Sequence, residues 1–186
     1  MRVLGLDPGF ERLGFGVVAE EPLELPTMGV ISYEIDPLLT FNQNLNAAIS
    51  NICDSFPRII QVYTPNEVAA EIVPSGKLGS KSELVVASIT VCKVICYQWG
   101  IPWTDYGANT IKDTLTGDGL ATKAQVRNAI LDLYPEWQTK FKEAKQAERR
   151  QGVKRPVGIP QDAFDGAAAA TTHVYKRRNG QSESSS

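Results

Sequence analysis

Four carboxylates stand where short apolar stretches begin or end: Asp7, Glu71, Asp162 and Asp165. The first ends an apolar run near the N-terminus, and the second lies towards the end of another such run. The last two, three residues apart, open an alanine-rich stretch. If the fold brings the four together, they cannot all stay ionised without cations, because like charges a few ångström apart repel strongly. Ligands that are all oxygen favour Mg2+ or Mn2+ over Zn2+. The residue types therefore predict a site for a hard divalent ion.

Each acid taken alone also has an ordinary structural explanation. Asp7 precedes Pro8 and Gly9, a combination that suits an Asx-turn in which the carboxylate accepts from nearby backbone N–H groups. Glu71 could lie on the exposed face of an edge strand. Asp162 and Asp165 would complement the helix dipole in a first turn. These readings remain open for the single residues, whereas the set of four favours a metal site.

The positions of glycine and proline and the spacing of apolar residues predict the strands and helices that must position the acids. Apolar runs separated by glycine and proline predict three consecutive strands near the N-terminus, which form an antiparallel meander. Apolar residues three or four apart predict a helix over 38–56, with Pro57 ending or kinking it. A strand, an almost entirely apolar helix and another strand follow, over 67–73, 83–99 and 101–106.

The C-terminal third reads as helices. A short helix over 109–115 precedes a second over 122–134, which Thr122 caps. A polar, basic segment and a loop occupy 136–160, and the last helix begins at Asp162 with both aspartates on one face. We expect one domain over 1–178 and a flexible tail over 179–186.

Charge is distributed unevenly along the chain. The whole sequence carries a formal charge of −2, but residues 1–139 have a balance of −7 and residues 140–178 a balance of +6. A basic face is therefore expected in the C-terminal part. Three cysteines predict no disulfide framework, and Cys92 and Cys96, one helical turn apart, fit core packing better than metal binding. His173 lies about 16 Å along a helix from Asp162, too far to share a metal, so we expect a packing or surface role.

No apolar run approaches the length of a membrane span, and no leader-like segment precedes the first strand. These features predict no membrane association and a cytoplasmic location, including the nucleoid or the cytoplasm of a virus-infected cell.

The order of elements and four short stretches resemble the RuvC family of Holliday junction resolvases. The stretches lie at 4–9, 69–71, 111–117 and 162–168, with Gly14, Gly16, Thr122 and Lys123 beside them. The resemblance covers most of residues 1–178. It implies an α/β fold of the ribonuclease H-like class, with a mixed five-stranded sheet of three antiparallel strands followed by two parallel ones, flanked by helices.

The same resemblance implies a function in DNA recombination and repair. Family members are homodimeric, metal-dependent endonucleases that nick four-way junctions symmetrically and leave a 5' phosphate and a 3' hydroxyl. Carried over to this chain, Asp7 would be shared by two Mg2+ or Mn2+ ions, Glu71 would bind one of them, and Asp162 and Asp165 would complete the site. A branch-migration helicase would be a further partner, of unknown identity.

Basic residues are expected to hold the DNA. Lys112 and Lys123 resemble family lysines that bind junction phosphates, although two solvated lysines remain an alternative. Further candidates are Lys77, Lys81, Arg149, Arg150, Lys154 and Arg155. The last four belong to the basic segment 136–160, which is longer than expected for the family and reads either as an added phosphate-contacting element or as a solvated helix face.

Two features depart from or compete with this interpretation. Ile72 follows Glu71 where bacterial family members carry an aromatic side chain that wedges into the junction, so junction opening is expected to differ. Three other functions fit parts of the pattern: a ribonuclease H-like nuclease for other branched or hybrid nucleic acids, a non-catalytic junction-binding protein, and a fragment of an actin-like ATPase.

Overall fold

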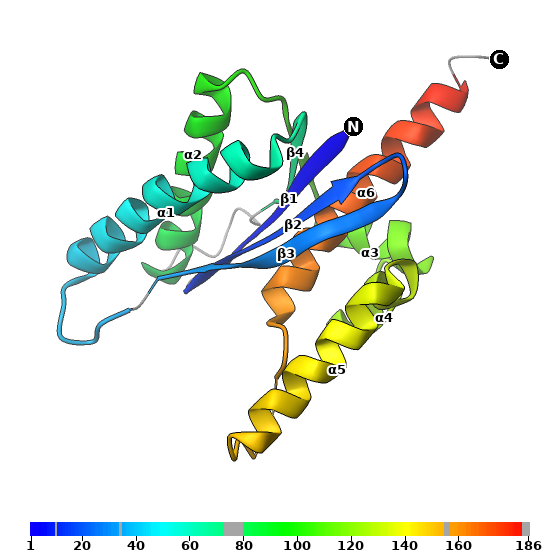
Figure 1. Cartoon of the computed structure of the whole chain (residues 1–186). Helices are drawn as coiled ribbons and strands as arrows, with labels where there is room; N and C mark the ends of the chain where they lie inside the picture. The colour runs from blue at the N-terminus through cyan, green and yellow to red at the C-terminus, as the bar shows by residue number, and fades with distance from the viewer. Residues whose placement is uncertain (10, 34, 73–79, 155–156, 184–186) are drawn as a thin grey trace.

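The chain is built around one mixed sheet (Figure 1). The computed structural model describes residues 1–183 except 10, 34, 73–79 and 155–156, and for 80–82 and 181–183 it describes only the backbone. The strand order is β3-β2-β1-β4-β5. The bounds are β1 Arg2–Pro8, β2 Arg12–Ala19, β3 Glu24–Ser32, β4 Glu67–Glu71 and β5 Trp103–Tyr106. β1 to β3 pair antiparallel, while β4 and β5 run parallel to β1, which confirms the predicted fold class.

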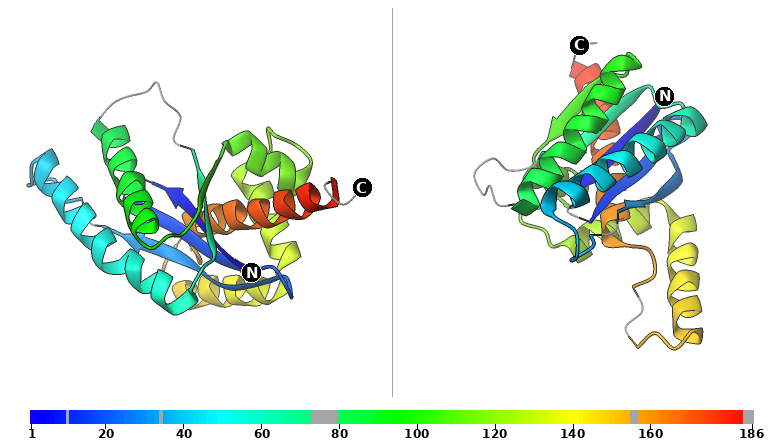
Figure 2. Two further views of the ribbon diagram at one scale, coloured as in Figure 1. Left: turned by 90° about the horizontal axis from the view of Figure 1, so that it is seen from above. Right: turned by 90° about the vertical axis from the view of Figure 1, so that its left-hand side faces the viewer.

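Helices cover both faces of the sheet (Figure 2). One core joins the sheet to α1 (Phe41–Tyr63) and α2 (Ser80–Gln98). The other joins it to α6 (Gln161–Glu183), together with α3 (Ala108–Thr116), α4 (Lys123–Leu133) and α5 (Pro135–Arg150). Within the described residues, no helix combines the length and the apolar character needed to cross a bilayer.

Helix α6 lies directly on the backbone of β1 and β2. A Cβ atom added at Gly14 would lie 1.9 Å from the carbonyl oxygen of Asp162, and one added at Gly5 would lie 2.1 Å from that of Gly166. Only glycine permits this approach. The start of α6, which carries two of the four acids, is therefore held at backbone contact with the strands beside Asp7.

Two helices extend beyond their predicted ends. α1 is one helix that continues through Pro57. Proline removes one N–H donor, but Ile52, Phe56 and Ile60 are buried on both sides of it and keep the helix packed on the sheet. α6 continues to Glu183, so the first five residues of the predicted tail are helical, whereas 184–186 lie outside the described residues.

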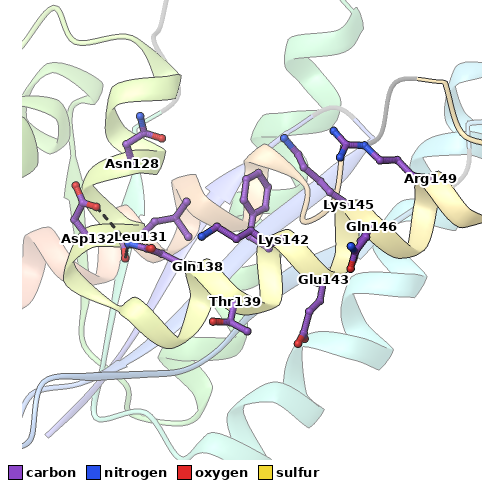
Figure 3. Close-up of a pocket in the computed structure, with 11 residues that line it drawn as sticks. Asn128, Leu131, Asp132, Gln138, Thr139, Lys142, Glu143, Lys145, Gln146 and Arg149 are labelled. Carbon is purple, nitrogen blue, oxygen red and sulfur yellow. Dashed lines mark hydrogen bonds between the residues drawn. The ribbon is translucent and has the colours of Figure 1, made fainter.

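The basic segment after α4 folds as helix α5. Its first turns are anchored: Trp137 is buried and its Nε1–H donates to the Leu25 carbonyl at 2.7 Å, and Phe141 meets Phe164 of α6 edge to face at 5.5 Å. The later turns extend away from the sheet (Figure 1). α4 and α5 border a groove of about 670 Å³ (Figure 3). The helix is thus fixed at one end to the elements that carry the acids.

His173 packs between α6 and the sheet, as expected for a structural histidine. It is 6% exposed, its Nε2 lies 2.6 Å from Glu67 Oε2, and its Nδ1 lies 2.9 Å from the Tyr106 hydroxyl. Arg177 also binds Glu67. These contacts tie the middle of α6 to β4 and β5. They lie several helical turns along α6 from Asp162.

Candidate metal centre and active site

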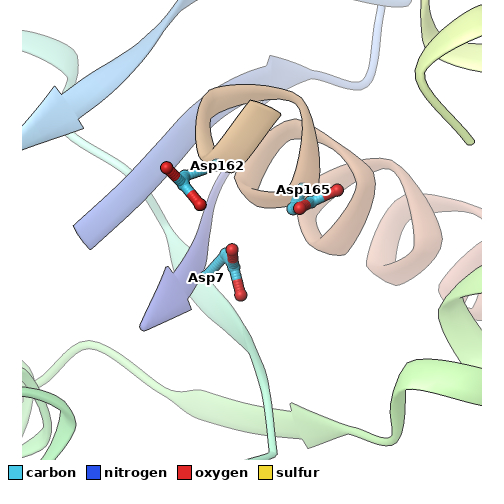
Figure 4. Close-up of side chains that lie close together, drawn as sticks. All are labelled: Asp7, Asp162 and Asp165. Carbon is cyan, nitrogen blue, oxygen red and sulfur yellow. The ribbon is translucent and has the colours of Figure 1, made fainter. Parts of the chain in front are cut away.

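Three of the four acids meet at one end of the sheet. Oxygens of Asp7, Asp162 and Asp165 all lie within 4.8 Å of one another (Figure 4). Asp7 comes from the end of β1, and the other two come from the first turn of α6. Asp165 is 8% exposed, and the other two are half-buried. Carboxylate oxygens this close together, partly shielded from water, suit a divalent cation.

Glu71 approaches the same place from the neighbouring strand. The parallel register pairs Leu6 with Ala70, so Glu71, the last residue of β4, lies abreast of Asp7. Side chains alternate along a strand, and Ala69 belongs to the core under α6, so Glu71 projects towards α6 as well. It lines a pocket of about 130 Å³ with Asp165, Lys112 and Lys123. Glu71 is therefore at the rim of the three-acid cluster and does not belong to the closest group.

Cations and an amide already contact the acids. Lys123 Nζ lies 2.6 Å from Asp165 Oδ2, and Gln161 Nε2 donates to the other oxygen of Asp165 at 2.9 Å. Arg12 Nε lies 3.7 Å from Asp162 Oδ2. Asp7 receives no such partner among the described residues, so its charge is the least compensated of the three.

Burial and like charge change the protonation of the site. Burial, followed by the charges of Asp165 and Glu71, raises the pKa of Asp7 from 3.8 to about 7. Burial and the charge of Asp165 also raise the pKa of Glu71. For Lys123, burial acts downward, but the hydrogen bond and charge of Asp165 outweigh it and raise the pKa. Raised carboxyl pKa values mean that the fully ionised site is unfavourable, and a bound cation would stabilise it.

The raised pKa of Asp7 predicts a pH-dependent cost to stability without metal. The folded state holds this proton more tightly than the unfolded chain, so its contribution is fully present below pH 3.8 and is lost as pH rises towards 7. In EDTA, Asp7→Asn should therefore gain stability over the natural chain as pH increases from 5 to 8, by up to a few kcal/mol. Thermal unfolding at each pH measures the difference.

The control for that measurement is Asp54→Asn, which removes an exposed carboxylate on α1. A difference in stability between Asp7→Asn and the natural chain that stayed constant from pH 5 to 8 would contradict this prediction. It would mean that ionisation of Asp7 does not destabilise the folded protein.

Sequence reasoning did not identify several residues that support the acids. Tyr33 is 4% exposed, and its hydroxyl donates to the Gly9 carbonyl at 2.5 Å, which fixes the turn after Asp7. Arg12 and Gln161 contact the aspartates of α6 as described. No motif marks these three residues, but both Arg12 and Gln161 lie within five residues of a predicted acid.

The predicted DNA-binding residues fall into three groups. Lys112 and Lys123 line the pocket beside Glu71 and Asp165. Arg149 lines the groove between α4 and α5, and Arg150 and Lys154 are exposed nearby in sequence. Lys77 and Arg155 lie outside the described residues, as does the side chain of Lys81.

A mixed sheet in this order, with acids at the ends of β1 and β4 and at the start of the last helix, defines the ribonuclease H-like class. The model of the family described as crossover junction endodeoxyribonuclease RuvC matches residues 3–147. This chain belongs to the RuvC family.

Individual relatives agree with this assignment. The chain is 32% identical to the crossover junction endodeoxyribonuclease RuvC of Histophilus somni over 133 residues, which cover 70% of this chain and 67% of that protein. It is 28% identical to RuvC of Methylorubrum extorquens over 149 residues, covering 79% and 76%. The structure of Thermus thermophilus RuvC in complex with a Holliday junction substrate superposes with a TM-score of 0.70 at 23% identity, over 97% of this chain and 96% of the other.

Proposed function

We propose that this protein is a structure-selective DNA endonuclease that resolves four-way junctions by metal-dependent nicking on opposing strands. The observation that carries the proposal is the convergence of Asp7, Asp162 and Asp165 within 4.8 Å, with Glu71 at the rim, in a chain of the RuvC family. Relatives with this family name are crossover junction endodeoxyribonucleases.

The four acids are suited to hold two Mg2+ or Mn2+ ions. The ligand set is all oxygen, and burial and like charges that raise the pKa of Asp7 support a site that a positive neighbour would stabilise. When bound, such ions supply a nucleophilic hydroxide and stabilise the leaving 3' oxygen, so that hydrolysis leaves a 5' phosphate. Asp7, Asp162 and Asp165, whose oxygens lie within 4.8 Å of one another, would hold these ions together with Glu71.

The lysines at the site would act on the DNA backbone. Lys112 and Lys123 project into the pocket beside Glu71 and Asp165. Lys123 Nζ lies 2.6 Å from Asp165 Oδ2. It is therefore close enough to contact a phosphate bound at the acids. As point charges on flexible stems, both would position that phosphate without reading sequence. Arg149, Arg150 and Lys154 would contact the backbone farther away.

Paired nicks require two active sites, and α2 offers a surface on which two copies could associate. Val86, Val94 and Tyr97 are 43%, 50% and 87% exposed along this helix. Exposed apolar side chains that recur along one helix are typical of an interface between chains. We therefore propose a homodimer, with α2 of each copy in the contact.

A cleavage assay tests the proposed function. A labelled four-way junction and a linear duplex of the same sequence are incubated with Mg2+ or Mn2+, and the cuts are mapped on every strand. We expect cuts at symmetric positions on two opposing strands of the junction, at least about 100-fold faster than on the duplex, and sedimentation of the protein as a dimer. Equal cleavage of both substrates would favour a general ribonuclease H-like nuclease instead.

A further inference from the structure

A row of cations leads from the active site along α4 and onto α5. Lys123, at the acids, and Arg127 are four residues apart on α4 and so share one face. Lys145 and Arg149 are likewise four residues apart on α5. The two pairs meet at Phe141: the Arg127 guanidinium lies 5.6 Å and the Lys145 ammonium 4.5 Å from the centre of its ring.

The three cations beyond Lys123 lack acidic partners. In the described part of the chain, each ion pair within 4.0 Å involves other residues than Arg127, Lys145 and Arg149. Glu148, next to Arg149 in the sequence, accepts from the Gly158 backbone N–H at 3.0 Å. Arg127 Nε is buried and has no hydrogen-bond partner. Two cations that share one ring without a carboxylate repel each other, and an unpaired buried donor is costly.

In the groove between α4 and α5, basic and acidic side chains lie on different sides of α5. It is lined by Lys142, Lys145 and Arg149 and also by Asp132 and Glu143. Figure 3 shows Lys145 and Arg149 on one side of α5 and Glu143 on the other. Gln138 Nε2 donates to Asp132 Oδ1 at 3.4 Å at the far end of the groove. The side of α5 that carries Lys145 and Arg149 is therefore positively charged.

The packing of α5 fixes this row of cations relative to the acids. The ring of Phe141, which Arg127 and Lys145 both contact, also packs on Phe164, the neighbour of Asp165. The bond from Gly158 to Glu148 ties the chain that returns to α6 onto the last turn of α5, four residues before Asp162. An extended ligand that starts at the acids and follows the row would thus meet charges at fixed positions.

We propose that Arg127, Lys145 and Arg149 form a cation track that continues from Lys123 and binds the phosphate backbone of one duplex arm of the DNA substrate. The ligand is a polyanion because the charges are spread over two helices, from Lys123 at the start of α4 to Arg149 in the last turn of α5. This inference rests on the proposed function and deepens it: the track lies outside the acids and adds affinity for an arm, with no part in the chemical step.

The test removes two charges of the track and leaves a polar side chain at each position. Lys145→Gln with Arg149→Gln is compared with Arg58→Gln plus Lys176→Gln, which removes two exposed charges from α1 and from the far end of α6. Arg127 is left in place because it also packs on Phe141. Binding to a four-way junction in EDTA is measured at several salt concentrations, and cleavage is measured at saturating protein with Mg2+.

We expect the track variant to bind the junction about 10-fold to 100-fold more weakly at about 0.1 M salt, with the slope of log K against log salt reduced by about 2. The control variant should keep both values and the cleavage rate of the natural chain. A track variant that matches the control overturns the track and leaves the proposed function intact. Failure of the natural chain to bind the junction at all overturns the proposed function itself.

Discussion

Asp7→Asn is expected to lower Mg2+-dependent nicking of a four-way junction by about 10³-fold or more, equivalent to about 4 kcal/mol of transition-state stabilisation. The change keeps the shape of the side chain and removes one negative charge from the centre of the cluster, where Asp7 lies within 4.8 Å of both Asp162 and Asp165. Junction binding should survive, because the basic residues that would contact phosphates are untouched. Single-turnover cleavage and a gel-shift titration measure the two effects separately.

Glu71→Gln is the informative comparison for that experiment. Glu71 lies at the rim of the cluster, so its loss should reduce cleavage while preserving more metal affinity than the loss of Asp7. Asp54→Asn on α1 serves as the control for a lost surface charge. Full nicking activity in both Asp7→Asn and Glu71→Gln would show that the acids are not the catalytic centre, and a non-catalytic junction-binding role would then be preferred.

Among the glycines that the structure describes, Gly14 should be the one at which a change to alanine is most damaging. The new Cβ would lie 1.9 Å from the Asp162 carbonyl oxygen, and backbone atoms on both sides leave nothing flexible to move aside. Such overpacking costs about 3 kcal/mol or more. α6 would have to shift away from β2 and carry Asp162 with it, so we expect cleavage to fall at least about 100-fold even where the protein remains folded. Chemical denaturation and single-turnover cleavage measure the two losses.

Gly180→Ala provides the matched control. It adds the same methyl group to helix α6, at a position where no atom lies within 4 Å of the new Cβ. Because alanine favours a helix over glycine, this variant should be as stable as the natural chain or slightly more stable. Equal stability of Gly14→Ala and Gly180→Ala would contradict the close contact between β2 and α6.

The order of elements and the four acids could be predicted because their signals are local. Glycine and proline mark the ends of β1 and β2, and the three-residue spacing of Asp162 and Asp165 places both on one helix face. The contacts of Arg12, Tyr33 and Gln161 depend on how β2, β3 and α6 come together, so no local pattern announces them. The continuous α1 shows the same limit, since buried side chains on both sides of Pro57 outweighed a reliable helix-breaking signal.

The basic segment illustrates the difference between composition and geometry. An excess of lysine and arginine after residue 139 predicted a charged face but not its shape. The spacing of Lys145 and Arg149 is visible in the sequence. Their alignment with Arg127 is not, because it depends on the packing of α5 against α4 around Phe141.

The backbone contact between α6 and the sheet has a consequence for which ion the acids would accept. Since glycine leaves no side chain between the two elements, the backbone that carries Asp162 lies directly against the strand beside Asp7. Mg2+ requires near-ideal octahedral ligation at about 2.1 Å, whereas Ca2+ prefers longer bonds and more ligands. The close backbone contacts at Gly5 and Gly14 would therefore favour the smaller ion.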